Sequence, residues 1–586
     1  MFQTPVPDLG SLRRMLWTAL AVSLLVALVL GLIYGPRLSN TLGDTDDAMR
    51  MALVQDLAHG RGWYDPSVAR LQPPMGSFMH WTRLIDGGIA GLILLFKPLF
   101  GWSGAQLAAR FLWPLLWIPP TVFSALVLAR RLGGPHAVAP AAVLLMASLP
   151  LYWQFIPGRV DHHNAQITLC LIAAAGAVSG DRRSAAIAGL AIALGLAVGL
   201  ESILFAAAIC AAIALRFILS DRGRRPAIAF GAALALGAGT VFLIQTPPSR
   251  WGLAVCDAMG ANLVLGLALG GLGLAGAAMA CAKAGPATRA AAAGLAGVVA
   301  LGAYLALDPN CRHGPMAEID PRLYPIWLGK VEELMTWPQL YTHYPDHVFI
   351  AAATSLLSLG SLVFFLRRTQ SRTDLAWLLV GGLLLLAIGL AASAARMESY
   401  LLWFAVPLLA AALAELSARK LRSALVPTLA VALAVSTAPM NVLAGVLFKA
   451  KAAQNAALEQ ADHCYDADAY RQLSALPPGL ALSEIDIGPY ILARTPHAIL
   501  NAPYHRMRWG ILSAEDALAS SPQVARAKVE ALHVTYVAAC PAHAALFNHV
   551  RQPAGSLLRV LDADVPPPWL TRLSPTGAPL RIYRVN

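Results

Sequence analysis

Long apolar runs recur along most of this chain and are separated by short clusters of arginine and lysine. A run of about 20 apolar residues crosses a bilayer as a helix, and runs rich in Leu and Ala are helices rather than barrel strands. The pattern therefore predicts an all-α polytopic membrane domain with about thirteen transmembrane helices. The predicted spans are approximately 15–35, 108–130, 136–156, 165–180, 184–200, 202–219, 226–244, 261–281, 287–307, 349–366, 374–394, 399–417 and 423–447.

The basic clusters predict which side of the membrane each loop occupies. Arginine and lysine concentrate in cytoplasmic loops, and Arg13 and Arg14 precede the first run, so we expect a cytoplasmic N-terminus. The loops on the other side then include a long first external loop, 36–107, and everything after about residue 448. Within that first loop the apolar run 87–101 is short and contains a lysine and a proline, which favours an interfacial or re-entrant helix.

The end of the chain differs in composition from the rest. From residue 449 onward it is far less apolar and carries short β-like runs at 534–538 and 580–585. We therefore predict two domains: a transmembrane catalytic domain, 1–448, and a small C-terminal α/β domain, 449–586, on the outer (periplasmic) face.

Composition supports a membrane protein and narrows its partners. Of 586 residues, 57% are hydrophobic and 13% are charged. The net charge of +12 falls mostly in short loops between helices, so the positive-inside rule explains much of it and no nucleic-acid partner is expected. Cys256 with Cys311, and Cys464 with Cys540, fall in segments predicted to lie outside the cytoplasm, where disulfides form. The sequence leaves their pairing open.

The most informative polar motif is Asp161-His162-His163, directly behind an apolar run. Ionisable side chains at the mouth of a membrane helix are costly and usually have a function. An aspartate and a histidine two residues apart can converge on one cation, and this mixture of hard oxygen and imidazole suits Mn²⁺ or Mg²⁺, with Zn²⁺ as an alternative. The motif predicts a metal or phosphate site.

Two further groups of polar residues lie in the first external loop. Asp44, Asp46 and Asp47 precede Arg50 and could bind a cation or act as a base, or they could cap the helix that follows; both roles can hold together. Later in the loop, His80 lies next to a tryptophan near the predicted membrane surface.

Candidates also occur in the later external segments. Glu318 lies in the loop after the ninth span and is either a ligand or part of a solvated turn. Arg396 and Glu201 lie at the outer ends of spans, where an arginine either extends to water or clamps a lipid phosphate.

This layout resembles the class-C (GT-C) membrane glycosyltransferases, and most closely the archaeal form of the oligosaccharyltransferase catalytic subunit. That family has thirteen spans, a long first external loop with interfacial helices and an outward-facing C-terminal domain. Asp44, six residues before Arg50, matches the family's first-loop acid, and Asp161-His162-His163 resembles the archaeal second-loop motif whose Asp and His bind metal.

The resemblance extends to other site residues. Glu318, three residues before Pro321, resembles the fifth-loop glutamate that contacts the acceptor. Arg396 stands where a donor-phosphate arginine is expected, and His80 resembles a first-loop histidine. The resemblance thus implies Asp44, Asp161 and His163 as metal ligands, Asp44 and Glu318 as catalytic groups, and His80, His162 and Arg396 at the donor phosphate.

The chain departs from the family in the acceptor motif. Where the family has Trp-Trp-Asp-Tyr-Gly, this chain has Glu484-Ile485-Asp486-Ile487-Gly488, which keeps the aspartate and the glycine but lacks both tryptophans. An ordinary asparagine-sequon acceptor is therefore less expected. Asp486, with Tyr504 and His505 downstream, remains a candidate for contacts with another acceptor.

Together these features predict an inverting glycosyltransferase of the inner membrane with its active site facing the periplasm. It would move a sugar or oligosaccharide from a polyprenyl-phosphate or polyprenyl-diphosphate donor to a protein, lipid or glycan acceptor, with a divalent metal. One alternative is a metal-independent transferase that uses a polyprenyl-monophosphate sugar. The other is a transporter or flippase for lipid-linked glycans, although transporters usually place their charges at mid-span, and here the charges cluster at outer helix ends.

Overall fold

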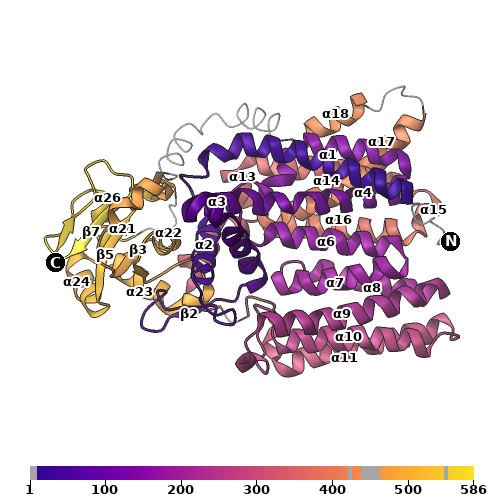
Figure 1. Cartoon of the computed structure of the whole chain (residues 1–586), viewed down its shortest axis with the longest axis horizontal. Helices are drawn as coiled ribbons and strands as arrows, with labels where there is room; N and C mark the ends of the chain where they lie inside the picture. Colours follow the sequence, from indigo (N-terminus) through magenta and orange to yellow (C-terminus); the bar gives the residue numbers. More distant parts are fainter. Residues whose placement is uncertain (1–8, 318, 420–424, 437–460, 462, 547–551) are drawn as a thin grey trace.

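The computed structural model of the chain describes all residues except 1–8, 318, 420–424, 437–460, 462 and 547–551. It consists of a bundle of long helices with a smaller domain of strands and short helices at one end (Figure 1). The domain boundary predicted at residue 448 falls among the undescribed residues.

The helices of the bundle coincide with the predicted apolar runs. They are α1 (Leu9–Tyr34), α3 (Arg83–Leu116), α4 (Ile118–Gly133), α5 (Val138–Ala147), α6 (His163–Ser179), α7 (Arg182–Val198), α8 (Ile203–Leu219), α9 (Arg224–Gln245), α10 (Ala261–Ala280), α11 (Pro286–Leu307), α14 (Pro345–Leu366), α16 (Leu375–Ser393), α17 (Glu398–Arg419) and α18 (Leu425–Ala434). In the described part of the chain, eight helical stretches are long and apolar enough to cross a membrane, or nine with the bent pair of α5 and Leu149–Phe155. The chain is thus built as a multi-pass membrane protein, while the count of thirteen crossings remains a prediction.

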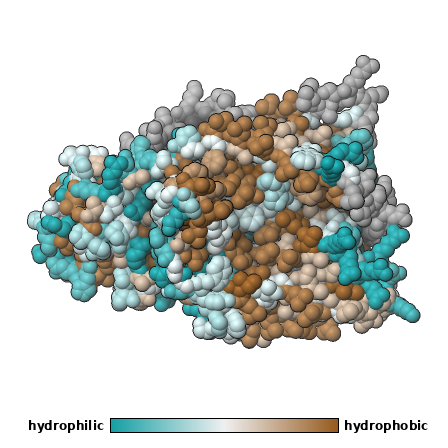
Figure 2. All heavy atoms as spheres, viewed as in Figure 1, coloured by the Kyte–Doolittle hydropathy of each residue, from teal (hydrophilic) through white to brown (hydrophobic). Residues whose placement is uncertain are grey.

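The surface of the bundle fits this assignment. Figure 2 shows a face that is mostly hydrophobic over the long helices and mostly hydrophilic over the smaller domain and at the opposite end of the bundle. Leu24, Leu236 and Leu356 are each 70% exposed or more on their helices. Extended apolar surface of this kind is rare on soluble proteins and marks a membrane-facing region.

The first external loop contains a short helix over the run 87–101, where the sequence predicted one. α3 begins at Arg83, and at Gly101 its backbone leaves helical geometry, with a φ of 66° and a ψ of −177°, so α3 consists of two helices joined at a kink. Glycine adopts this conformation without strain. The second helix contains the start of the predicted span 108–130, and the interfacial or re-entrant position of the first remains a prediction. The other helix of the loop is α2 (Thr45–Ala58).

The C-terminal domain is built on one five-stranded sheet, as its composition predicted. The strand order is β4-β3-β5-β7-β6, with β4, β3 and β5 parallel and β7 and β6 antiparallel. The strands are β3 (Leu480–Ser483), β4 (Ala498–Ile499), β5 (Val534–Ala539), β6 (Leu570–Arg572) and β7 (Arg581–Val585). Its longer helices are α22 (Gly488–Arg494), α23 (Arg508–Leu518), α24 (Pro522–Ala531) and α26 (Leu557–Asp562).

The first loop and the C-terminal domain are joined through backbone hydrogen bonds. The N–H of Gln72 donates to the Ile499 carbonyl at 2.8 Å, and the N–H of Ile499 donates to the Arg70 carbonyl at 2.8 Å. The first loop thereby covers the free edge of β4, which would otherwise expose unpaired backbone groups. Both predicted disulfides, Cys256–Cys311 and Cys464–Cys540, are present.

Candidate active site

The Asp161-His162-His163 motif lies where α6 begins, and its three side chains form one cluster. Nδ1 of His162 lies 2.6 Å from Asp161 Oδ1, and Nε2 of His163 lies 3.2 Å from Asp161 Oδ2. One ligand atom from each of the three residues lies within 4.8 Å of the others. Asp161 and His163 are 2% and 6% exposed. The motif thus gathers one carboxylate and two imidazoles, as the sequence predicted.

A buried network of alternating charges holds Asp161 in place. Arg50, on α2, donates to Asp161 Oδ1 at 3.3 Å and to Asp86 Oδ1 at 2.9 Å. Arg83 donates to the other Asp86 oxygen at 3.0 Å, and all four side chains are 2% exposed or less. Because removing one partner of such a network leaves a buried charge unpaired, the orientation of Asp161 depends on the first loop.

The charges around Asp161 also keep it ionised. Burial raises the pKa of Asp161, but the neighbouring His162 and His163 outweigh burial and hold the pKa well below its ordinary value. An ionised carboxylate is the form that binds a metal.

At the N-terminus of α2, Asp44 caps the helix and also lines the cavity. Asp44 is the N-cap and accepts from the N–H groups of Asp46 and Asp47 at 3.0 and 2.9 Å. The Asp44 carboxylate also forms an ion pair with Arg159. The structure therefore places Asp44 in the same cavity as the metal cluster but does not bring it within the compact group of Asp161 and the two histidines.

The sequence grouped Asp46 and Asp47 with Asp44 as one set of acids. In the structure each of the two has its own contacts at the candidate site. The Asp47 Oδ1 atom accepts from the backbone N–H groups of Val160 and Asp161 at 2.7 and 3.0 Å, so it fastens the metal motif to α2. Burial, followed by the charge of Asp161, raises the pKa of Asp46 well above its ordinary value. Asp46 is thus the acid of this segment that shares the electrostatic environment of the cluster.

Arg396 and Glu201 meet at the far side of His163. The Glu201 carboxylate lies 3.0 Å from His163 Nδ1 through one oxygen and accepts from Arg396 at 2.8 Å through the other. Metal-binding histidines commonly use their second nitrogen in this way, which fixes ring orientation. Arg396 lines the cavity as predicted, and it is held there by an acid whose role the sequence left ambiguous.

Glu318 lies outside the described residues, and another glutamate of the same loop reaches the cluster. Glu333 Oε1 lies 3.9 Å from His163 Nε2 and 4.0 Å from an Arg159 nitrogen. It lies in the short helical turn Glu332–Leu334 and lines the cavity. In the sequence, Glu333 is marked only by its acidic side chain. Its neighbours in the chain do not distinguish it from a solvated loop residue.

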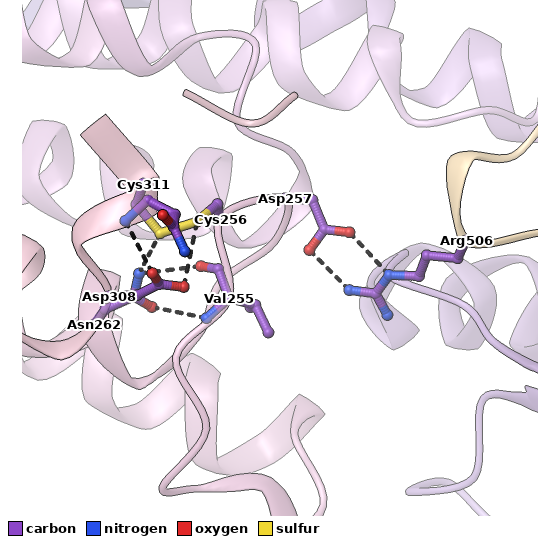
Figure 3. Close-up of a disulfide and its surroundings, with 8 residues drawn as sticks. Val255, Cys256, Asp257, Asn262, Asp308, Cys311 and Arg506 are labelled. Atoms are coloured by element: carbon purple, nitrogen blue, oxygen red, sulfur yellow. Dashed lines mark hydrogen bonds and ion pairs between the residues drawn. A yellow bond between two sulfur atoms is a disulfide. The ribbon is translucent and has the colours of Figure 1, made fainter. Parts of the chain in front are cut away.

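A second cluster gathers around Asp257, in the loop between α9 and α10. Nε2 of His505 lies 2.7 Å from Asp257 Oδ2, and Arg506 donates to both Asp257 oxygens at 2.8 Å. The ring centroid of His80 lies 4.7 Å from that of His505. Figure 3 shows Asp257 and Arg506 directed toward each other, beside the disulfide formed by the preceding residue, Cys256. This group therefore joins the first loop, the α9–α10 loop and the C-terminal domain.

The residues predicted to contact the acceptor substrate differ in their surroundings. Asp486 lines the cavity, and burial raises its pKa. Tyr504 also lines it, but its hydroxyl donates to the Thr45 carbonyl at 3.0 Å and its ring packs edge-on against Trp81. Tyr504 thus also has a structural role in fastening the C-terminal domain to the start of α2.

One cavity of about 1250 Å³ connects these groups. Its polar wall contains His80, His162, Glu201, Arg396 and Asp44, together with residues of the C-terminal domain. Its apolar wall, between helix ends, is lined by Leu196, Leu204, Phe242, Leu253 and Leu390. The cavity exceeds the usual range for one small ligand, about 300–1,000 Å³, and has room for two substrates.

The cluster suits a divalent cation. Asp161 is buried, with His163 Nε2 3.2 Å from its Oδ2 atom and His162 Nδ1 2.6 Å from its Oδ1 atom, so a carboxylate and two imidazoles are close enough to share one cation. Glu333 adds an acidic group beside them, with Oε1 3.9 Å from His163 Nε2. Oxygen with imidazole is a donor set for Mn²⁺, Zn²⁺ or, with more oxygen ligands, Mg²⁺.

The fold is that of known GT-C glycosyltransferases. The chain superimposes on archaeal oligosaccharyltransferase AglB from Archaeoglobus fulgidus, in complex with an inhibitory peptide and a dolichol-phosphate, with a TM-score of 0.64 and 15% identity over 97% of this chain and 74% of that one. It matches an Archaeoglobus fulgidus oligosaccharyltransferase tethered to an acceptor peptide containing the NVT sequon with a TM-score of 0.65, at 15% identity, over 97% and 74% of the two chains. The form complexed with Zn and sulfate gives 0.58, at 16% identity, over 96% and 73%. No protein-family model and no curated protein matches the chain. The predicted resemblance in fold is thereby confirmed.

Proposed function

We propose that this protein is an inverting glycosyltransferase that moves a sugar or oligosaccharide from a polyprenyl-phosphate or polyprenyl-diphosphate donor to an acceptor on the outer face of the inner membrane. The observation that carries the proposal is the single cavity in which a buried acid–imidazole cluster, basic groups and an apolar wall meet on a GT-C fold. The neighbour that shares this fold was solved with a dolichol-phosphate and a peptide, which supports a lipid-linked donor.

The donor would bind with its prenyl chain along the apolar wall and its phosphate among the basic groups. His80, His162 and Arg396 line the cavity and can donate hydrogen bonds to phosphate oxygens. Burial, followed by the charge of His505, lowers the pKa of His80 well below its ordinary value. A neutral His80 can then donate one hydrogen bond to the phosphate without carrying a charge.

The metal ligands would be Asp161 and His163, with Asp44 or Asp46 completing the set. A divalent cation bound there would supply positive charge beside the leaving phosphate. Glu201 orients His163, Arg50 orients Asp161, and Arg396 stays within reach of the donor. These residues pre-organise the site so that little reorganisation is needed during reaction.

The acceptor nucleophile would be aligned by an acid at the start of α2. Asp46 is the acid of this segment whose pKa is raised, first by burial and then by the charge of Asp161, and its carboxylate would serve as the general base. Asp44 stands beside it, and Glu333, in place of the undescribed Glu318, approaches from the opposite loop. An attack from the side opposite the leaving phosphate inverts the anomeric carbon.

Release of sugar from a lipid donor tests this proposal without knowledge of the acceptor. Purified protein in nanodiscs is incubated with radiolabelled polyprenyl-phosphate and polyprenyl-diphosphate sugars, and water-soluble sugar is counted. We expect release that is lost on chelation and restored by Mn²⁺. Release that resists exhaustive chelation would support the metal-independent transferase, and donor translocation in proteoliposomes without any release would support a flippase.

A further inference from the structure

The parallel strands of the C-terminal domain direct their carboxyl ends into the active-site cavity. Glu484 and Asp486 follow β3, Asn501 follows β4 and His543 follows β5, and all four residues line the cavity. Ligands of open α/β sheets bind outside the carboxyl ends of parallel strands. This edge therefore offers a ligand subsite that faces the catalytic groups of the bundle.

The subsite is rigidly built. Glu484 accepts from the Cys540 N–H at 2.6 Å and lies 3.2 Å from His543 Nδ1, so the segments after β3 and β5 are tied together. At Gly488, a Cβ would lie 2.1 Å from the Asn501 carbonyl oxygen, so only glycine allows the segments after β3 and β4 to approach this closely. The polar groups of the edge are thus positioned before any ligand binds.

Three buried atoms of this wall lack a hydrogen-bond partner, and all are oxygens. They are Asn501 Oδ1, Gln552 Oε1 and Asp562 Oδ1; no other buried side-chain polar atom among the described cavity-lining residues of the C-terminal domain is unpaired. Asn501 and Gln552 are 3% and 8% exposed. The amide nitrogen of Gln552 donates to Glu515 at 2.9 Å, so its oxygen is the free group. Buried acceptors without donors are unfavourable until a ligand supplies them.

We infer that this wall of the cavity, formed by the edge of the sheet together with α26 and the segment before it, binds a carbohydrate acceptor, whose hydroxyl groups donate to Asn501, Gln552 and Asp562. The inference rests on the proposed function and specifies its acceptor. A glycan carries many hydroxyl donors on one compact ring, which matches three separate acceptors on three chain segments. An ammonium group would require oxygens converging on one point, and an extended peptide offers fewer donors. Glu484 and Ile485, in place of two tryptophans, are consistent with this difference.

Binding of free glycans tests the inference independently of catalysis. Saturation-transfer NMR is recorded on the full chain in nanodiscs with EDTA and no donor, with maltotriose, mannotriose, arabinotriose and an Asn-Val-Thr hexapeptide as probes. We expect transfer to at least one trisaccharide and none to the peptide. Absence of transfer to every trisaccharide, or binding of the peptide alone, overturns the inference.

Variants show whether binding uses the proposed edge. Asn501→Ala combined with Asp562→Ala should lower the affinity for the bound trisaccharide at least tenfold, and Asp562→Asn, which keeps the shape of the side chain, should lower it severalfold. Asp516→Asn, on an exposed residue outside the cavity, should bind like the native chain. Unchanged affinity in Asp562→Asn and in any folded double variant overturns the inference.

The two proposals can fail separately. Trisaccharide binding should survive Asp161→Asn, because the subsite does not require the metal cluster. Trisaccharide binding without sugar release from any lipid donor would reject the proposed function and leave a glycan-binding site. Transfer of sugar to peptide without trisaccharide binding would reject the inference and leave the glycosyltransferase.

Discussion

Two clusters of imidazoles and carboxylates lie in one cavity, and they are built in different ways. Asp161, His162 and His163 are consecutive in sequence and buried, and each charge has a partner within the membrane domain. His80, Asp257 and His505 come from three distant segments and are partly exposed. The first cluster is a local motif held by the bundle, whereas the second exists only where the C-terminal domain meets two loops.

The two clusters are therefore expected to serve different purposes, the first the reaction and the second the contact between domains. A cluster pre-organised within one domain can hold a cation through every stage of substrate binding. A cluster shared between domains depends on how they are docked, and Arg506 already uses both oxygens of Asp257. We therefore expect mutations in the first cluster to abolish reaction and mutations in the second to weaken domain docking.

The largest effect is expected for Asp161→Asn. Loss of this charge removes the proposed metal ligand and leaves Arg50 partly unpaired, so sugar release should fall by about 10³-fold. The assay is the release of radiolabelled sugar from the lipid donor. The matched control is Asp56→Asn, a partly exposed aspartate of α2 outside the cavity, which should retain native activity. An equal loss of sugar release in Asp161→Asn and Asp56→Asn would contradict the role assigned to Asp161.

A smaller and more specific effect is expected for Glu201→Gln. The acid orients His163, so its removal should weaken metal binding by about 10–100-fold, in the range typical of such supporting residues. Titration of activity with Mn²⁺ measures this, and excess Mn²⁺ should restore most of the rate. A lower maximum rate with unchanged Mn²⁺ dependence would contradict the assigned positioning role.

Asp257→Asn should loosen the second cluster without touching the first. Two hydrogen bonds from Arg506 would lose their charged acceptor, which corresponds to about 1.5–3 kcal/mol of docking free energy. Hydrogen exchange should increase along residues 501–507, while Mn²⁺ affinity stays native. Glu530→Gln, which breaks an exposed ion pair on α24, is the control. A change in Mn²⁺ affinity as large as in Glu201→Gln would show that the clusters are not separable.

The smallest effect is a pH dependence of trisaccharide binding. Burial, followed by the charge of Glu484, raises the pKa of Asp562 to about 7, against the lowering effects of Arg559, Arg581 and His543. Hydroxyl donors favour the ionised carboxylate, so affinity should fall severalfold as pH decreases from about 8 to about 6. Calorimetry across this range measures it. The Asp562→Asn variant should bind independently of pH, and an equal dependence in that variant would assign the titration to another group.

The sequence by itself determined the helical bundle, the α/β domain and the cluster of Asp161, His162 and His163. Helical spans follow from the length of apolar runs, which the bilayer fixes, and the motif could be found because Asp161, His162 and His163 are neighbours in the chain. Both disulfides join cysteines that the sequence had grouped together, although it left their pairing open.

Only the tertiary structure decided which residues accompany the motif. Asp46, Glu201, Glu333 and Asp257 reach the cavity from four separate segments, and Asp47 ties the motif to α2. A lone acid at a helix end has the same local sequence pattern whether it contacts only water or supports a ligand. The angle between the two helices of α3 was also not determined locally, because glycine at position 101 allows several backbone conformations and packing against neighbouring helices selects one.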